Sequence, residues 1–198
     1  LGGRSGQGFG KRLMSLLARL PSVRGSLKAD VSLAPYSWLR VGGPAETFFI
    51  PKDEADLAHF LSSNPDDIPV QVLGVASNTL IRDGGVKGVV IRLGPAFAKI
   101  TAEGDRLTAG AAALDNKVAK EAAKAGISGL EFYAGIPGTI GGALRMNAGC
   151  YGGETKDVLV EAVALDRRGR RQIMPLAELN YRYRGSDAPE DLIFTQAV

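Results

Sequence analysis

The glycine-rich stretch at residues 129–154 constrains the fold of this 198-residue chain more than any other segment. Each glycine raises the entropy cost of ordering the backbone, so we expect neither an ordinary helix nor an ordinary strand there. Glycines also leave backbone N–H groups open to a phosphate or a flat ring. Apolar side chains alternate with them, which is unusual for a solvated loop. The stretch therefore predicts a cofactor cradle, with a glycine-rich surface loop as the alternative.

Composition narrows the class of protein. With 45% hydrophobic and 23% charged residues and a net charge of +3, the sequence is typical of a globular protein. Cys150 is the only cysteine, which suits a reducing compartment, and there is no apolar run near membrane-spanning length and no signal-peptide pattern. We expect a cytoplasmic monomer that binds neither membrane nor nucleic acid. The arginines of residues 167–171 predict a solvated hairpin turn rather than a nucleic-acid patch. His59 is the only histidine, so we expect no histidine-based metal site.

Hydrophobic periodicity and capping residues predict the secondary structure. Gly126 follows the helix at residues 114–125 as a natural C′ residue, and Asp53 can cap the helix that runs to about residue 62. The predicted helices cover residues 9–20, 53–62 and 114–125, and the predicted strands cover residues 46–50, 70–73, 88–93, 98–102, 107–111, 158–166, 171–174 and 192–198. Helices and strands do not alternate regularly, so the sequence favours an α+β fold.

A second candidate phosphate loop follows the strand at residues 70–73. Residues 74–78 read Gly-Val-Ala-Ser-Asn, which offers backbone N–H donors together with a hydroxyl and a carboxamide. Taken alone this is weak, because Ser-Asn turns are common for local hydrogen-bonding reasons. Neither glycine cluster fits a Rossmann fingerprint, since Pro137 and the spacing of Gly135, Gly138 and Gly141 disagree with it.

Four motifs in one order carry a family resemblance. They are Trp-Leu-Arg-Val-Gly-Gly-Pro-Ala at residues 38–45, Gly-Val-Ala-Ser-Asn at 74–78 followed by Arg-Asp-Gly-Gly at 82–85, the glycine run at 135–152, and Tyr-Arg-Gly-Ser at 183–186. Together they resemble the UDP-N-acetylenolpyruvoylglucosamine reductases over about residues 30–198. The resemblance implies two α+β subdomains of the vanillyl-alcohol-oxidase type that hold FAD between them. We assign residues 1–30 to an N-terminal helical extension, 31–95 to subdomain 1 and 96–198 to subdomain 2.

The resemblance also implies a reaction and the residues that carry it. The family uses NADPH to reduce the enolpyruvyl ether of a UDP-sugar to UDP-N-acetylmuramate for peptidoglycan. Arg184 would contact the substrate and stabilise an enolic intermediate, since its charged fork can hold a carboxylate or enolate. Tyr183 and Asn147 would also bind substrate, although Tyr183 could equally be packing. The residues predicted to hold FAD are Gly42, Gly74, Val75, Ala76, Ser77, Asn78, Gly135, Ile136, Pro137, Gly138, Gly141, Gly142, Ala143 and Asn147.

Two departures from the family affect these expectations. Val75 and Ala76 stand where family members often have glycines. The family also places a proton-donating serine and an assisting glutamate in a third domain, which we expect to lie beyond this chain, so we predict weak or no enolpyruvyl reduction by these 198 residues. An FAD-dependent oxidase or dehydrogenase of the same fold, acting on another small molecule, is the alternative function, and a non-catalytic nucleotide-binding module is a third.

Overall fold

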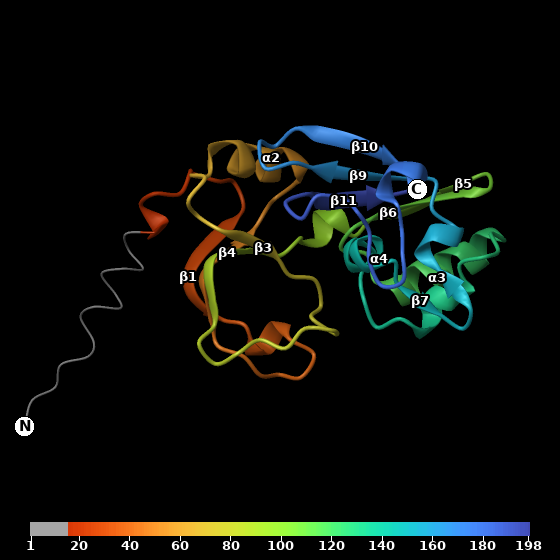
Figure 1. Cartoon of the computed structure of the whole chain (residues 1–198), viewed down its shortest axis with the longest axis horizontal. Coiled ribbons are helices and arrows are strands. Elements are labelled where there is room, and N and C mark those ends of the chain that lie inside the picture. The colour runs from red at the N-terminus through yellow and green to blue at the C-terminus, as the bar shows by residue number, and fades with distance from the viewer. Residues whose placement is uncertain (1–15) are drawn as a thin grey trace, which may run out of the picture.

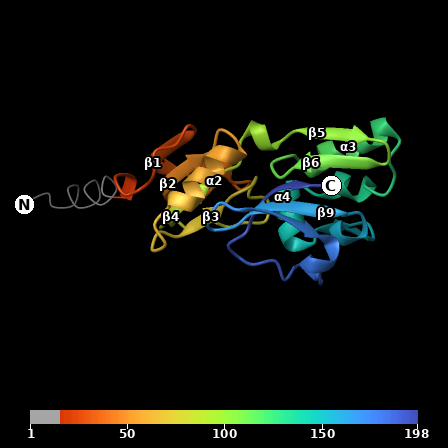
Figure 2. The same ribbon diagram turned by 90° about the horizontal axis from the view of Figure 1, so that it is seen from above.

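The computed structural model describes residues 16–198, which form two halves, each organised around its own β-sheet (Figure 1). Viewed from above, the halves lie side by side along the long axis (Figure 2). The first sheet has the strand order β1-β2-β4-β3 and the second the order β10-β9-β11-β6-β5. The predicted helix at residues 9–20 falls largely outside the described residues, but Leu16 is buried in the first half's core.

The first half mixes antiparallel and parallel pairing. Its strands are β1 (Ser26–Ser32), β2 (Pro44–Ile50), β3 (Val70–Val72) and β4 (Val86–Ile91), with α2 (Glu54–Ser63) packed on the sheet. β1 pairs antiparallel with β2, whereas β2 and β3 both run parallel to β4. Phe49 of β2 meets Phe60 of α2 with ring centroids 4.6 Å apart. Asp53 caps α2 as predicted, because its carboxylate accepts from the Asp56 N–H at 2.9 Å.

The second half is an antiparallel sheet with helices on one side. Its strands are β5 (Ile100–Glu103), β6 (Arg106–Gly110), β9 (Glu161–Leu165), β10 (Arg171–Pro175) and β11 (Ile193–Ala197), and the short β7 (Gly149–Cys150) and β8 (Gly153–Glu154) form a separate pair. The helices are α3 (Asp115–Ala125) and α4 (Ile140–Met146), with 3₁₀ turns η1 (Ala34–Tyr36), η2 (Pro95–Phe97), η3 (Glu131–Gly135), η4 (Thr155–Asp157) and η5 (Leu176–Leu179). Gly126 ends α3 at φ +70°, which confirms the predicted cap.

The structure corrects two expectations about local structure. The glycine-rich stretch does contain a helix, α4, because Ile140 and Leu144 bury one face of it and Gly141 lies against Ala111. A Cβ on Gly141 would lie 3.2 Å from the Ala111 Cβ, so the glycine permits a close approach that offsets its poor helix propensity. The first sheet also begins before residue 31, since β1 starts at Ser26 inside the predicted extension and ends at Ser32 beyond it.

The two halves share a core and a docked turn. Phe49 and Phe60 of the first half cluster with Leu165 and Ile193 of the second. The β9–β10 turn at residues 167–171 is largely exposed, as predicted, and it also makes contacts with α2 and the segment that follows α2. The Arg167 guanidinium donates to the Ile68 carbonyl oxygen, Arg168 pairs with Asp66 at 3.4 Å and Arg171 pairs with Glu54 at 3.3 Å. In residues 16–198 no helix combines the length and apolar content needed to cross a membrane.

Candidate cofactor site

The first predicted phosphate loop, residues 74–78, leaves its hydrogen-bond donors free. The hydrogen bonding between β3 and β4 ends just after β3, where the Leu73 N–H donates to the Ile91 carbonyl oxygen at 2.8 Å. Beyond it, no backbone N–H from Gly74 to Asn78 donates to another group of the described residues, and neither do the Ser77 and Asn78 side chains. Exposed donors in one short loop are suited to a polyanion.

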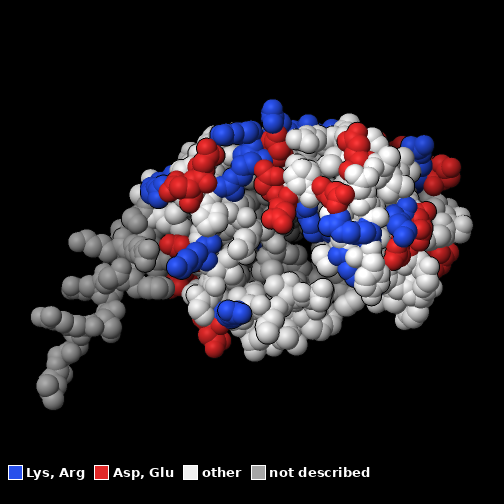
Figure 3. Space-filling view, viewed as in Figure 1, with Lys and Arg blue, Asp and Glu red and all other residues white. Residues whose placement is uncertain are grey.

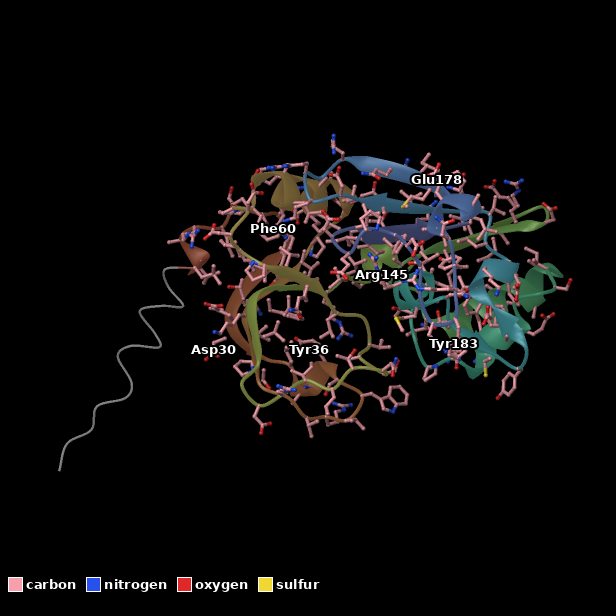
Figure 4. The ribbon with its side chains drawn as sticks, in the orientation of Figure 1. Asp30, Tyr36, Phe60, Arg145, Glu178 and Tyr183 are labelled. Atoms are coloured by element: carbon pink, nitrogen blue, oxygen red, sulfur yellow. The ribbon has the colours of Figure 1, made fainter. Side chains whose placement is uncertain are left out.

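Two details qualify this first loop. Ala76 is buried and adopts φ +50°, a conformation that glycine takes more readily, so an alanine here strains the backbone. Val75 lines a pocket of about 390 Å³ together with Tyr36 and Arg92. Tyr36 points into the ring of ribbon made by the first half (Figure 4).

The second predicted loop, residues 135–142, meets the first one. A Cβ added to Gly74 would lie only 2.9 Å from Thr139 Oγ1, so the two loops touch across the boundary between the halves. The Ile140 and Gly141 N–H groups are already used, since they donate to Ala113 and Ala111 at 3.0 and 2.8 Å. The N–H groups of Gly138 and Thr139 donate to no backbone carbonyl of the described residues. Figure 3 shows a hollow at the centre of the molecule, between the two halves.

Some predicted site residues lie away from this surface. Gly42 has φ +123°, and a Cβ on it would lie 2.7 Å from the Ile81 Cβ, so it packs two loops of the first half together. Ala143 is buried in α4. Asn147, which ends α4 at φ +44°, is fully buried. Exposed or half-exposed residues of the second loop are Gly135, Ile136, Pro137, Gly138, Gly141 and Gly142.

Asn147 links the glycine-rich stretch to the Tyr-Arg motif. Its side-chain nitrogen donates to Glu154 Oε2 at 3.0 Å and to the Arg182 carbonyl oxygen at 3.2 Å, while its side-chain oxygen accepts from the Lys156 N–H at 3.0 Å. Lys156 also pairs with Glu154 at 2.7 Å, and its hydrogen bond lowers the pKa of Glu154. The amide thus fixes where residues 182–184 lie relative to the stretch.

Arg184 lies at a second pocket, formed by the other half of the glycine-rich stretch. This pocket of about 420 Å³ is lined by Gly149, Cys150, Tyr151, Gly152, Gly153, Glu154, Lys156, Asp157 and Arg184. Arg184 has φ +55° and donates to the Gly149 carbonyl oxygen at 3.2 Å. Tyr183 is 80% exposed, so it is not a core packing residue, and Arg182 pairs with Asp187. Tyr183 lies beside the ribbon of the stretch in Figure 4.

Sequence reasoning missed two residues that support the site. The Arg145 guanidinium donates to the carbonyl oxygens of Ala188, Pro189 and Leu192 at 3.0, 2.9 and 2.6 Å. Asp115 is fully buried behind Gly138, and burial raises the pKa of its carboxyl to about 7. The sequence signal for Asp115 is weak: the aspartate follows an apolar run at residues 111–114 near the start of a predicted helix.

Comparison with known proteins identifies the family. Proteins described as FAD binding domains match this chain over residues 45–174. The chain belongs to this family. FAD is therefore the cofactor of the domain, and the predicted α+β fold of the vanillyl-alcohol-oxidase type is confirmed.

Individual relatives agree with the resemblance carried by the motifs. The chain is 63% identical over 186 residues to UDP-N-acetylenolpyruvoylglucosamine reductase of Maricaulis maris, covering 93% of this chain and 59% of that protein. The corresponding crystal structure from Thermus caldophilus is 34% identical with a TM-score of 0.74, over 89% of this chain and 61% of that one. These matches confirm the resemblance. The chain spans about 60% of the length of the curated relatives it matches.

A more distant structure shows the fold alone. The 6-hydroxy-D-nicotine oxidase of Arthrobacter nicotinovorans has a TM-score of 0.64 at 18% identity, over 89% of this chain and 42% of that one.

The contact between the two loops agrees with FAD binding. Gly74 leaves no room for a side chain beside Thr139, while Ser77 and Asn78, which follow Gly74 in the same loop, keep uncommitted donors.

Proposed function

We propose that this chain is the FAD-binding part of a UDP-N-acetylenolpyruvoylglucosamine reductase. The observation that carries the proposal is the meeting of residues 74–78 and 135–142, two loops from different halves whose Gly74 and Thr139 are in contact. The first loop keeps the N–H groups of residues 74–78 free, and the Thr139 N–H of the second loop donates to no backbone carbonyl of the described residues, so together the loops can contact a pyrophosphate. When bound there, FAD supplies the hydride carrier between NADPH and the enolpyruvyl double bond.

The substrate side of the reaction is assigned to Arg184. Its guanidinium uses one donor on the Gly149 carbonyl oxygen and lines the open pocket, where its positive charge and its other N–H donors remain available. A permanently charged, planar fork can hold the carboxylate of an enolpyruvyl group and stabilise negative charge that develops on it. The partner implied is a UDP-sugar in the cytoplasm.

Asn147 has a supporting part in this proposal. Both N–H donors of its carboxamide are used by Glu154 and the Arg182 carbonyl, its oxygen accepts from the Lys156 N–H, and the residue is buried. It therefore positions the Arg184 segment instead of contacting FAD or substrate directly.

The FAD assignment is tested by removing a donor that the fold does not use. Ser77→Ala breaks no hydrogen bond of the described residues, so its folding stability is expected to match that of the wild type. Loss of a hydrogen bond to a charged phosphate is expected to weaken FAD binding by about tenfold or more. Ser62→Ala is the matched control, since Ser62 lies on α2 and its hydroxyl donates to the His59 carbonyl oxygen.

The measurement is a titration of the apo-protein with FAD, followed by the visible flavin absorption. Unchanged affinity in Ser77→Ala, or an equal loss in Ser62→Ala, would contradict the placement of the pyrophosphate. Bleaching of the bound flavin by NADPH and its recovery on adding the enolpyruvyl substrate to the full-length protein would support the reductase. Bleaching by another small-molecule donor would favour an oxidase or dehydrogenase of the same fold.

A further inference from the structure

Asp115 is a buried acid that touches the second loop from the protein interior. Its relative exposure is 0%, and neither carboxyl oxygen makes a hydrogen bond of good geometry, although the Gly138 N–H lies near enough to lower the pKa of the group slightly against the effect of burial. Its backbone N–H donates to the Gly138 carbonyl oxygen at 3.2 Å, and a Cβ on Gly138 would lie 2.6 Å from Asp115 Oδ2. The carboxyl group and the loop are therefore in direct contact, with no room for a side chain between them.

The described surroundings of Asp115 provide no compensating positive charge. Residues 135–142 contain no charged side chain. Arg145, the charged residue of α4, turns away to backbone carbonyls of residues 188–192, and Lys117 of α3 is exposed. Tyr133 of η3 is the titratable group that senses Asp115: burial, and to a smaller extent the charge of Asp115, raise the pKa of its hydroxyl. That hydroxyl donates to Thr155 Oγ1 at 3.2 Å. An ionised Asp115 would thus be a buried charge without an ion-pair partner.

A pyrophosphate on the loop would make that charge less favourable still. Like charges near each other disfavour ionisation, and their interaction is strong where water is excluded. An ionised Asp115 would also attract the Gly138 N–H as a hydrogen-bond donor. An N–H group that donates to the Asp115 carboxylate is not available to donate to the pyrophosphate on the other side of the loop. Binding of an anionic cofactor and ionisation of Asp115 are therefore antagonistic.

We propose that Asp115 is a proton-linked positioning residue of the FAD site: the loop binds the pyrophosphate with this carboxyl group neutral. Above neutral pH, one proton passes from solvent to the Asp115 carboxylate when FAD binds, and it returns to solvent when FAD dissociates. The proposal rests on residues 135–142 being the pyrophosphate loop. It agrees with the pKa of Asp115, which burial raises to about 7.

The test is a pH series of FAD affinities, measured by quenching of FAD fluorescence on the apo-protein. For the wild type, the dissociation constant is expected to be constant from about pH 5.5 to pH 6.5 and to rise by up to tenfold per unit above about pH 7. Asp115→Asn, which mimics the neutral carboxyl group, is expected to bind FAD with no such slope. Asp105→Asn, the same chemical change in the exposed β5–β6 turn, keeps the wild-type profile.

Calorimetry in two buffers of different ionisation enthalpy counts the protons directly. Near pH 8, wild-type protein is expected to take up a proton on binding FAD and Asp115→Asn none. Asp115→Ser serves if the asparagine variant does not fold. A wild-type affinity that is flat across this range, or a slope that survives in the neutral variants, overturns the role of Asp115 while leaving FAD binding intact. Absence of FAD binding at every pH overturns the loop assignment and this inference with it.

Discussion

Asp115→Asn is expected to change how the folding stability of this chain depends on pH. Burial raises the pKa of Asp115 from 3.8 to about 7. Between these values the folded chain keeps a proton that the unfolded chain loses, so stability falls as pH rises from about 4 to about 7 and does not fall further above it. The shift is roughly 3 units, and at about 1.36 kcal/mol per unit it corresponds to ~4 kcal/mol.

The assay is urea denaturation of the apo-protein at several pH values from about pH 4 to about pH 8. Asp56 and Asp166 have lowered pKa values because backbone N–H groups donate to them, so they act in the opposite direction in both proteins. Subtracting the variant's unfolding free energy from that of the wild type isolates Asp115. This difference, wild type minus variant, is expected to become more negative by ~4 kcal/mol as the pH rises across this range. A pH-independent change in stability caused by the asparagine shifts all the values equally and does not alter this result. A difference that stays level within about 1 kcal/mol, or one that Asp105→Asn reproduces, would refute the reasoning.

Two further substitutions test how the halves and the site are held together. Gly169→Ala is expected to cost about 2 kcal/mol or more in urea melts, because φ is +72° and its Cβ would lie 2.2 Å from the Ala58 carbonyl oxygen. Gly104→Ala, with φ +61° and open space around it, is expected to cost only about 1 kcal/mol, and equal losses would argue against the docked turn. Arg145→Leu is expected to cost about 3 kcal/mol, because three backbone carbonyls of residues 188–192 lose their donor. Arg145→Lys should recover part of this, and a stability equal to wild type in the leucine variant would show that these bonds contribute nothing.

The local sequence determined most of the secondary structure. Asp53 and Gly126 mark the ends of α2 and α3, and the hairpin of β5 and β6 lies where alternation and the turn residues placed it. These signals are local, because capping and turn formation depend on residues a few positions apart. The helix α4 was missed, since only contact with Ala111 explains why Gly141 is acceptable within it.

The docked β9–β10 turn shows the same limit at longer range. Its arginines are largely exposed, as expected, but Arg167 and Arg171 also bind groups of the first half about a hundred residues earlier in the chain, which the sequence did not predict. Nothing in the turn's own composition encodes such partners. Contacts between residues so far apart in the sequence form only when the two sheets pack together.

The glycine-rich stretch shows what each source of information decided. The sequence by itself carried the family resemblance, through four motifs in one order, and it identified both loops that we propose to surround FAD. Only the tertiary structure divided the stretch in two, with residues 135–142 against Gly74 and residues 149–154 forming the pocket of Arg184. It alone placed an unpartnered carboxyl group, Asp115, behind Gly138. The physical reason is that motifs record which residue types are present, whereas burial and charge compensation depend on neighbours that only the folded chain brings together.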